Sequence, residues 1–371
     1  MSAAGREPLR LGYDARCLTV ARRPVRTGVE YYAHHLLQGL ARRDLRLTVF
    51  TAPGADLGVD GASQVGVRGA ESSLAWPLAL GGAVRGRRLD VLLVPEQYLP
   101  VGPGLPPSVA VVHDVHFLAH PHSYGRLSRL KLTVATRQVV AGARRVAVVS
   151  ESVEAELLER FPRLEGRLAV VSPACDPELF RPRPAAEVRA TLERLAAPRP
   201  YLLYVGALAP HKNVGAVLRL AARHSDLGVV VAGPDKGAEA GLRGLAAELG
   251  LGARARFLGY VDDRDKADLM AGAELFVFPS RHEGFGLPVL EAMACGTPVL
   301  CSDRGSLPEV LGDGGLAVPP DDAEALAAAA ATLLDSTERV RAGRRALARS
   351  RAYSWPESAA RMHRLALEAA G

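Results

Sequence analysis

The chain has 371 residues, a length typical of about two domains, and its hydrophobic content of 48% is enough for two cores. The formal net charge of +6 favours anionic partners such as nucleoside diphosphates or a lipid surface. Nucleic acid would suit the same charge. However, the sequence has no zinc-finger spacing, no long basic run and no aromatic-basic stacking motif, so we expect no nucleic-acid partner.

The four cysteines, Cys17, Cys175, Cys295 and Cys301, form no C-x-x-C pair and are typical of reduced thiols in a cytoplasmic protein. No compact Cys/His cluster favours zinc. The N-terminus lacks the apolar core of a signal peptide, and no apolar run reaches the roughly 18 residues of a spanning helix. We therefore expect a cytoplasmic protein whose contact with a membrane would be peripheral.

The first half of the chain alternates between apolar strands and amphipathic helices. Strands are predicted at residues 9–15, 45–52, 90–94, 109–112, 145–150 and 168–172. Helices are predicted from Gly28, over residues 74–88 and 126–141, and from Glu151, whereas residues 56–67 are rich in turn formers. This alternation is typical of a parallel sheet covered by helices.

Polar residues follow the predicted strand at residues 109–112, where His113, Asp114 and His116 stand. The carboxyl end of a parallel strand is well placed for a site. A strand-end turn with a buried, satisfied His113 is the alternative interpretation. A metal site that adds His120 and His122 to the two other histidines has no fixed spacing to support it.

Prolines cluster at both ends of residues 181–199, which are predicted to be a linker. The alternation of strands and helices then resumes. Strands are predicted at residues 201–205, 229–232, 256–261, 276–278 and 298–301. Helices are predicted from Val214, over residues 264–273, from Pro288, after Asp322, and over residues 339–351 and 357–370.

Residues 276–303 contain the densest set of site features. After a short apolar strand come a loop with Glu283 and a helix start at Pro288, whose missing N–H costs nothing in a first turn. Free amides at a helix N-terminus beyond a parallel strand favour a phosphate. Glu283, and Glu291 in the predicted first turn, would repel a phosphate, so we expect them to bind sugar hydroxyls.

Glu283 and Glu291, with seven residues between them and the run GFGLPVLEAMACGTPV around the second, resemble the E-x7-E motif of family 4 glycosyltransferases. These are retaining enzymes of GT-B fold that use nucleotide sugars. The tail LPEVLGDGGLAVPPDD resembles the same family, and the first half resembles it less closely. The alternative is an ordinary strand–helix unit with acids favoured by the helix dipole.

The resemblance implies an α/β protein of GT-B fold, with two Rossmann-like domains facing across a cleft. Residues 1–180 would form the acceptor-binding domain, to which a C-terminal helix, residues 356–371, crosses back. Residues 200–355 would form the nucleotide-sugar-binding domain, after the linker at residues 181–199.

The resemblance also implies transfer of a hexosyl-type sugar from a nucleotide-diphosphate donor to a hydroxyl of a glycan, a lipid-linked sugar or a small molecule. It implies no essential metal and no other cofactor. Lys212, in the loop after the strand at 201–205, is the best cation for the leaving diphosphate. The donor-binding residues would be Gly206, His211, Lys212, Glu283, Gly284, Phe285, Gly286, Leu287 and Glu291, with Glu283 on the sugar and Glu291 on the ribose.

On the acceptor side, the resemblance places His113 against the transferred sugar as a catalytic residue, beside Lys212 and Glu283. Asp114 or His116 would face the acceptor. Gly28, in Thr27-Gly28-Val29-Glu30, would allow a close approach between backbone and ligand, although a plain loop before a helix is the alternative.

The sequence departs from the family pattern near the diphosphate. Ala207 stands where many relatives have an arginine, and His211 where some have one, and a histidine is charged only when protonated. A non-catalytic binding protein, or an epimerase-like or phosphorylase enzyme of the same fold, is therefore the alternative. The motifs GxGxxG after a strand, GxxxxGK[ST] and GxSxG are missing, which argues against dehydrogenases, P-loop kinases and α/β-hydrolases. Nothing in the sequence indicates an oligomeric state.

Overall fold

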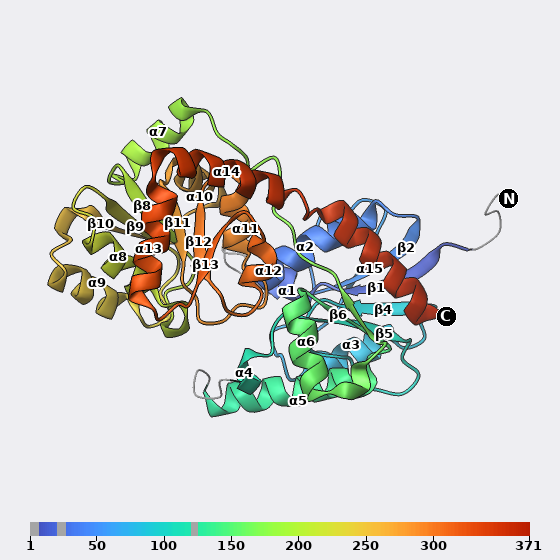
Figure 1. Ribbon diagram of the computed structural model, residues 1–371. Coiled ribbons are helices and arrows are strands. Elements are labelled where there is room, and N and C mark those ends of the chain that lie inside the picture. Colours follow the sequence, from blue (N-terminus) through green and yellow to red (C-terminus); the bar gives the residue numbers. More distant parts are fainter. Residues whose placement is uncertain (1–6, 21–26, 120–124) are drawn as a thin grey trace. The chain divides into compact units, whose positions relative to one another are not determined.

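The computed structural model describes residues 7–20, 27–119 and 125–371. The chain divides into two compact units (Figure 1): Met1–Pro173 together with Ser354–Gly371, and Ala174–Tyr353. Each unit is built on its own parallel sheet with helices around it. The predicted α/β architecture with two Rossmann-like sheets is confirmed.

The sheet of the first unit has the strand order β3-β2-β1-β4-β5-β6-β7, with every pair parallel. Its strands are β1 Leu9–Asp14, β2 Leu45–Thr51, β3 Ser63–Gly66, β4 Val91–Val94, β5 Ser108–Val112, β6 Arg145–Val148 and β7 Leu168–Val170. The central strands β4 and β5 read VLLV and SVAVV and are buried along their whole length, as expected of strands covered on both faces. The order reverses between β1 and β4, so ligand-binding loops are expected at their carboxyl ends.

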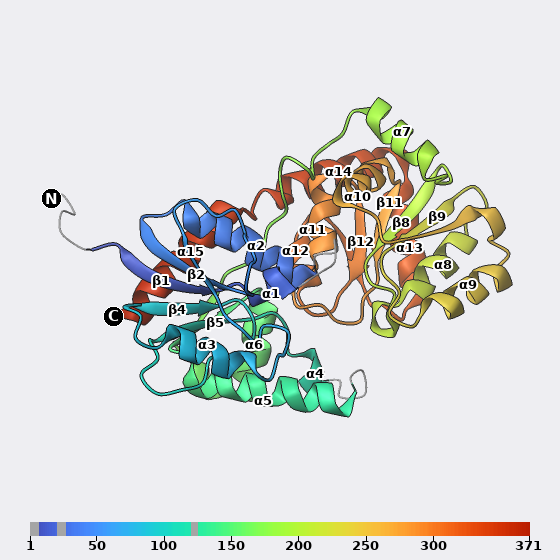
Figure 2. The same ribbon diagram turned by 180° about the vertical axis from the view of Figure 1, so that it is seen from behind.

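Helices cover both faces of this sheet. They are α1 Arg16–Val20, α2 Gly28–Ala41, α3 Trp76–Val84, α4 His116–Ala119, α5 Arg126–Gly142, α6 Glu151–Arg160 and α15 Trp355–Ala370. Figures 1 and 2 show α2 and α15 on one face and α3 and α5 on the other.

The last helix, α15, packs within the first unit although its sequence follows the second. Ser358 Oγ donates to the carbonyl oxygen of Ser172 over 2.5 Å, and the Trp355 ring stacks on His35 of α2 with 5.0 Å between the ring centroids. A Cβ on Gly39 of α2 would lie 2.7 Å from the Cβ of Ala359, so the glycine allows the two helices to approach closely.

The second unit has the strand order β10-β9-β8-β11-β12-β13, again all parallel. Its strands are β8 Tyr201–Val205, β9 Gly228–Ala232, β10 Ala255–Gly259, β11 Leu275–Phe278, β12 Val299–Ser302 and β13 Gly315–Val318. Its helices are α7 Ala185–Arg194, α8 Val214–Ala222, α9 Glu239–Glu248, α10 Asp263–Gly272, α11 Leu287–Ala294, α12 Leu307–Leu311, α13 Ala323–Leu334 and α14 Ser336–Ser350.

The predicted linker, residues 181–199, contains helix α7 and packs as part of the second unit. The buried carboxylate of Asp268 in α10 accepts hydrogen bonds from Arg183 Nε over 2.7 Å and from Thr191 Oγ1 over 2.8 Å. These bonds join α7 to α10, so this stretch behaves as a structural element of its unit.

Several short elements escape the sequence reasoning. Strand β3 lies in the stretch predicted to be turns, because its sequence SQVG contains a single large apolar residue and depends on pairing with β2. Helix α1 replaces part of a predicted loop, and α9, α12 and β13 are additional. Among the described residues, no helix has both the length and the apolar character needed to cross a bilayer.

Candidate active site

The second sheet reverses its strand order between β8 and β11, which pair through Leu202 and Leu275. Loops that leave neighbouring strands at such a reversal diverge and leave room for a ligand. The loop after β8 carries Lys212 and the loop after β11 carries Glu283, and Lys212 Nζ lies 2.5 Å from Glu283 Oε1. The structure thus brings together the two residues to which the sequence reasoning assigns the donor chemistry.

This ion pair is largely shielded from water. The side chains of Lys212 and Glu283 are 17% and 13% exposed, and Lys212 Nζ lies 5.8 Å from the centre of the Phe278 ring. Partial burial strengthens the attraction between opposite charges. The pair holds a cation suited to phosphate and a carboxylate suited to hydroxyls, and each compensates the charge of the other.

Arg281 joins the same two loops and was missed from the sequence. Its Nη1 donates to the carbonyl oxygen of Pro210 over 2.9 Å, its backbone N donates to His211 O over 2.8 Å, and its Nη2 lies 2.7 Å from Asp321 Oδ1. The signal available in the sequence was a second cation two residues before Glu283. Arg281 fixes the position of the loop that carries Lys212.

His211 lies in the short turn Pro210–Lys212, immediately before the lysine. Burial lowers the pKa of His211, and the neighbouring charge of Lys212 lowers it further. The imidazole is therefore neutral at pH 7, and at that pH it does not replace the arginine that some relatives carry here.

Gly206 follows β8 directly and donates from its backbone N to Ala232 O over 2.9 Å. A Cβ on Gly206 would lie 2.7 Å from the Tyr204 hydroxyl oxygen, and a Cβ on Gly233 would collide with the carbonyl of Gly206. Both positions therefore need glycine, which keeps the backbone accessible at the end of β8.

The backbone of Glu283 is held from a third loop, the one after β12. Ser306 Oγ donates to Glu283 O over 3.1 Å, and the backbone N of Ser306 donates to the same oxygen over 3.2 Å. Gly305 has φ +58°, and a Cβ there would lie 2.5 Å from Glu283 O. Glycine at position 305 thus allows this loop to lie directly against the loop that carries Glu283.

Helix α11 begins at Leu287, behind Gly286 as its N-cap residue with φ +96°. No side chain of the described residues caps this helix, Pro288 has no N–H, and Val289 N donates to Gly286 O over 2.9 Å, so the backbone N of Leu287 is the donor of the first turn that suits an anion. Phe285 is buried and meets the Tyr353 ring edge-on at 5.4 Å, so its side chain anchors the loop. The stretch Gly284–Leu287 is therefore suited to binding through its backbone.

Glu291 lies in the second turn of α11, and its prediction in the first turn was wrong, because the helix begins at Leu287. The residue is only 3% exposed. Its Oε1 lies 2.9 Å from Lys266 Nζ, which is also 2.9 Å from Asp263 Oδ1 and 4.8 Å from the centre of the Phe180 ring. Lys266 is a cation of this site that the sequence reasoning missed.

Two opposing effects act on this buried pair. Burial raises the pKa of Glu291, and the Lys266 ammonium acts against that rise. Burial disfavours the charged ammonium of Lys266, but Glu291 and Asp263 outweigh it and raise the pKa of the lysine. Lys266 is therefore the group that holds Glu291 in its anionic form.

In the first unit, His113 follows β5 and its Nε2 lies 2.8 Å from the carbonyl oxygen of Pro95. A carbonyl only accepts hydrogen bonds, so Nε2 carries the proton and Nδ1 is the acceptor atom. Burial lowers the pKa of His113 to about 4, and the ring meets the edge of Tyr32 at 5.1 Å. His113 is thus a neutral histidine that can accept a hydrogen bond from a hydroxyl.

The other residues predicted for the acceptor side differ in accessibility. Asp114 is half-buried and its Oδ1 accepts from the backbone N of His116 over 3.2 Å, whereas His116 itself is buried in α4. Gly28 is the exposed first residue of α2, next to a capping box in which Thr27 N donates to Glu30 over 2.7 Å. Asp114 is therefore better placed than His116 to meet an acceptor.

A metal site was the weaker interpretation of the histidines. His120 and His122 lie outside the described residues. Within the described ranges, no group of three His, Cys, Asp or Glu side chains is arranged to hold a metal ion.

A charged cluster at the end of β1 and β4 was also missed. Asp14 is 2% exposed and accepts from Trp76 Nε1 over 2.9 Å and from Arg16 N over 3.0 Å, and Arg16 Nη1 lies 3.6 Å from Glu96 Oε2. Burial raises the pKa of Asp14 to about 6 and that of Glu96 to about 7. These carboxyl groups stand where the first sheet reverses its strand order, a usual ligand position.

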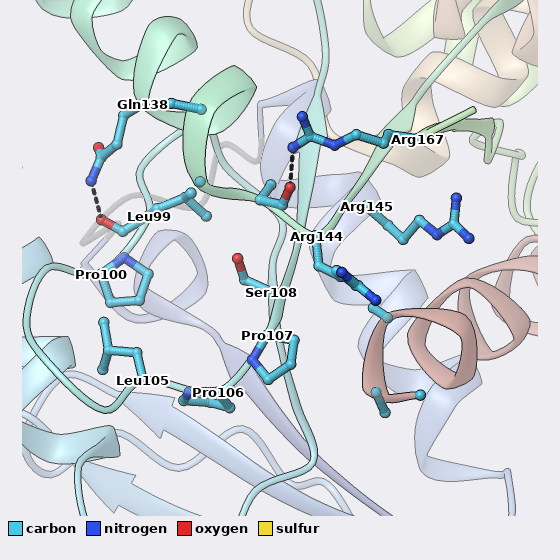
Figure 3. A pocket seen from close by; sticks show the side chains of 16 residues that line it. Leu99, Pro100, Leu105, Pro106, Pro107, Ser108, Gln138, Arg144, Arg145 and Arg167 are labelled. Atoms are coloured by element: carbon cyan, nitrogen blue, oxygen red, sulfur yellow. Dashed lines mark hydrogen bonds between the residues drawn. The ribbon is translucent and has the colours of Figure 1, made fainter. Parts of the chain in front are cut away.

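A pocket of about 860 Å³ lies at the amino ends of the strands of the same sheet, where β5 and β6 begin. Figure 3 shows Arg144, Arg145 and Arg167 along one side of it and prolines along the other. The Arg167 guanidinium donates to the carbonyl oxygens of Ala143 and Val140, so it stabilises the surrounding loop. The pocket is remote from the carboxyl ends of the strands.

Comparison with protein-family models gives two matches. Residues 192–349 match the model for glycosyl transferases group 1, and residues 26–179 match the model for glycosyltransferase family 4.

Curated relatives agree with these matches. The chain is 33% identical over 268 residues to O-antigen chain mannosyltransferase B of Escherichia coli, covering 70% of each chain. It is 34% identical over 279 residues to D-inositol 3-phosphate glycosyltransferase of Corynebacterium glutamicum, covering 69% of this chain and 66% of that one.

Solved structures share the fold. Sucrose-phosphate synthase of Thermosynechococcus elongatus superposes with a TM-score of 0.81 at 23% identity, covering 97% of this chain and 98% of the other. HepE of Anabaena, in complex with UDP and glucose, superposes with a TM-score of 0.75 at 18% identity, covering 96% and 98%.

Proposed function

Because the chain belongs to glycosyltransferase family 4, of GT-B fold, we propose that it transfers a hexosyl-type sugar from a nucleoside-diphosphate donor to an acceptor hydroxyl with retention of configuration. The bond from the anomeric carbon to the diphosphate breaks and a bond to the acceptor oxygen forms. The products are a glycoside, a nucleoside diphosphate and a proton. The observation that carries the proposal is the shielded pair of Lys212 and Glu283 where β8 and β11 diverge.

Donor binding would exchange the partners of this pair. The diphosphate takes the ammonium of Lys212 and the backbone N–H of Leu287 at the start of α11, where an anion is favoured. The carboxylate of Glu283 is then left to accept hydrogen bonds from sugar hydroxyls. Negative charge on the leaving diphosphate grows as the bond breaks, so Lys212 acts on the transition state.

Glu291 would bind the ribose. A carboxylate accepts bonds from vicinal hydroxyls, and Lys266 keeps it anionic inside the protein. A nucleotide donor is supported by the HepE neighbours, which were solved with UDP and with UDP-glucose.

The first unit would supply the acceptor side. Nδ1 of the neutral His113 can accept a hydrogen bond from a sugar hydroxyl, and Asp114 can orient the acceptor. The two curated relatives named above, a mannosyltransferase and an inositol-phosphate glycosyltransferase, support a polyhydroxylated acceptor. A glycan, a lipid-linked sugar or a small polyol satisfies this description.

The proposal needs no metal, because Lys212 and the N-terminus of α11 provide the positive counterpart to the diphosphate. Activity should therefore be unchanged after dialysis against EDTA. Activity that disappears and returns only with an added divalent ion would contradict the metal-free mechanism.

A thermal-shift panel with UDP, GDP, ADP and dTDP, each free and as its hexose, tests donor binding. A ligand at about 100 times its Kd stabilises the folded state by about 2.7 kcal/mol, so the correct nucleotide should raise Tm clearly. Release of that nucleotide in the presence of acceptors then tests transfer. The Glu283→Gln variant should lose at least about tenfold in kcat/KM. Glu248→Gln, at an exposed position of α9, is the control and should not.

A binding protein without catalysis is the second candidate, because Ala207 and the neutral His211 leave Lys212 without a neighbouring arginine from the β8 loop. Nucleotide binding without any turnover would favour it. Transfer of any hexose would exclude it.

A further inference from the structure

The first unit presents an apolar stripe on helix α5. Leu127, Leu130 and Val134 are 75%, 60% and 57% exposed, although leucine and valine are usually buried. Every residue from Gly125 to Lys131 is exposed, so the N-terminal part of this helix projects from the unit on all sides. Figures 1 and 2 show α5 along the outer side of the first unit.

The stripe lies opposite the side by which α5 is attached. At 3.6 residues per turn, Leu127, Leu130 and Val134 fall within about 60° of one another. The packed side is formed by the buried residues Ala135, Thr136, Val139 and Val140. These two arcs are centred about 180° apart, so the apolar stripe faces directly outward.

The charges beside the stripe all have one sign. Helix α5 contains Arg126, Arg129, Lys131 and Arg137 and no Asp or Glu. On the helical wheel, Arg126 and Arg137 border one side of the stripe and Lys131 borders the other. A row of leucines between long cationic side chains matches a surface that is apolar below and anionic above.

We propose that α5 docks the protein on an anionic lipid surface, with the helix lying in the interface plane. The leucines enter the boundary between headgroups and acyl chains, and Arg126, Lys131 and Arg137 contact lipid phosphates. A lipid surface is favoured over a protein partner because the stripe has positive charges on both sides and the helix has no acid. The proposal does not depend on the sugar-transfer function.

Vesicle sedimentation with the full-length protein tests this docking. One set of vesicles contains phosphatidylcholine and phosphatidylglycerol, and the other contains phosphatidylcholine alone. We expect binding to the anionic vesicles that weakens as salt is raised, and at least tenfold weaker binding to the neutral ones. The double variant Leu127→Ser/Leu130→Ser should bind at least about tenfold more weakly, and Lys131→Gln/Arg137→Gln, which removes one bordering charge from each side of the stripe, about 25-fold more weakly.

Matched controls separate the stripe from general effects of composition. Leu74→Ser/Leu78→Ser removes two leucines that are 69% and 65% exposed elsewhere in the first unit. Arg341→Gln/Arg344→Gln removes two exposed charges from α14 in the second unit. Both controls should bind vesicles as the native protein does, and all four variants should bind free nucleotide normally, which shows that they are folded.

Three outcomes would overturn the proposal. The first is native protein that stays in the supernatant with anionic vesicles. The second is a leucine variant that still binds them with native affinity. The third is native protein that light scattering shows to be a dimer, that ignores vesicles, and that Leu127→Ser/Leu130→Ser converts to a monomer. In that case the stripe is a contact between two copies of the chain.

Discussion

In the proposed function, Lys212 exchanges its observed partner Glu283 for the diphosphate of the donor. Lys212→Ala should lower kcat by at least about tenfold, since it removes a charge that opposes the negative charge developing on the leaving group. A Lys212→Ala effect confined to KM would place the diphosphate elsewhere. Lys236→Ala, at an exposed position in the loop after β9, is the control and should leave both constants unchanged.

Replacing Lys266 tests whether its charge keeps Glu291 deprotonated. In the native protein the ammonium 2.9 Å away acts against the effect of burial, which raises the pKa of the carboxyl. Lys266→Met removes that opposition, so Glu291 should take up a proton as pH falls and lose its strength as an acceptor for ribose hydroxyls. Calorimetry with UDP should show the variant's affinity falling as the pH is lowered from about 8 to about 6, a window above the ordinary carboxyl pKa.

Lys266→Arg is the rescue variant, because it keeps the positive charge beside Glu291. It should restore native behaviour across the same pH range. If Lys266→Met binds UDP with the same pH profile as the native protein, Lys266 has only a structural role.

At the scale of single residues, spacing in the sequence was enough to select Glu283 and Lys212, which the structure brings within 2.5 Å of one another. It was not enough for Lys266, Arg281 or Asp14. The role of each of these depends on a partner far along the chain, such as Glu291, 25 positions after Lys266. The neutrality of His211 was equally hidden, because it follows from burial.

At the scale of elements, the loop before α11 depends on glycine. Gly286 has φ +96°, and a Cβ there would lie 2.5 Å from Leu307 Cδ2. Gly286→Ala should cost about 2 kcal/mol of stability from the left-handed backbone alone and should weaken nucleotide binding by displacing the first turn of α11. Denaturant unfolding and UDP titration measure the two effects.

Gly241→Ala is the matched control for that substitution. Gly241 lies within α9, and a Cβ there would meet nothing within 4 Å. Alanine should stabilise the helix by about 0.5–1 kcal/mol and leave UDP binding unchanged. If Gly286→Ala binds UDP as the native protein does, the start of α11 does not contact the nucleotide.

The buried strands were predictable because runs such as YLLYV and FVF are apolar without interruption. Element boundaries were less predictable: α11 starts at Leu287, one residue before the predicted Pro288, and this one-residue shift is enough to place Glu291 in the second turn. Edge strand β3 was missed because it carries no strong pattern of its own, whereas α7 was missed although Val188 and Leu192 are buried at helical spacing, because prolines on both sides indicated a linker. Strand β3 is defined by pairing with β2, and α7 by the bonds of Arg183 and Thr191 to Asp268.

At the scale of the whole molecule, the chain builds one unit, then the other, and returns to the first with α15. The break at Tyr353-Ser354-Trp355-Pro356 was visible in the sequence, and Ser354 caps α15 by accepting from Glu357 N. That α15 packs in the first unit was expected only from the family resemblance. Its apolar side, which includes Met362 and Leu365, would suit either sheet, so the pattern alone does not select a unit.

This division into two cores predicts how stability responds to substitutions and to ligand. Met362 of α15 and Met270 of α10 are both fully buried, one in each unit. Replacing either by alanine leaves a cavity and should cost about 3 kcal/mol. Calorimetry should show Met362→Ala lowering the transition of the first unit, by about 2–4 °C per kcal/mol, and Met270→Ala lowering that of the second.

Nucleotide binding shows which unfolding transition belongs to which unit. UDP, or whichever nucleotide the panel selects, binds the second unit in the proposed function and should raise only that unit's transition, in the native protein and in Met362→Ala alike. Met270→Ala should lose part of this rise if the cavity loosens α10, the helix that carries Lys266. A single transition that both substitutions lower equally, and that the nucleotide raises as a whole, would show that the two cores unfold as one and would contradict the prediction.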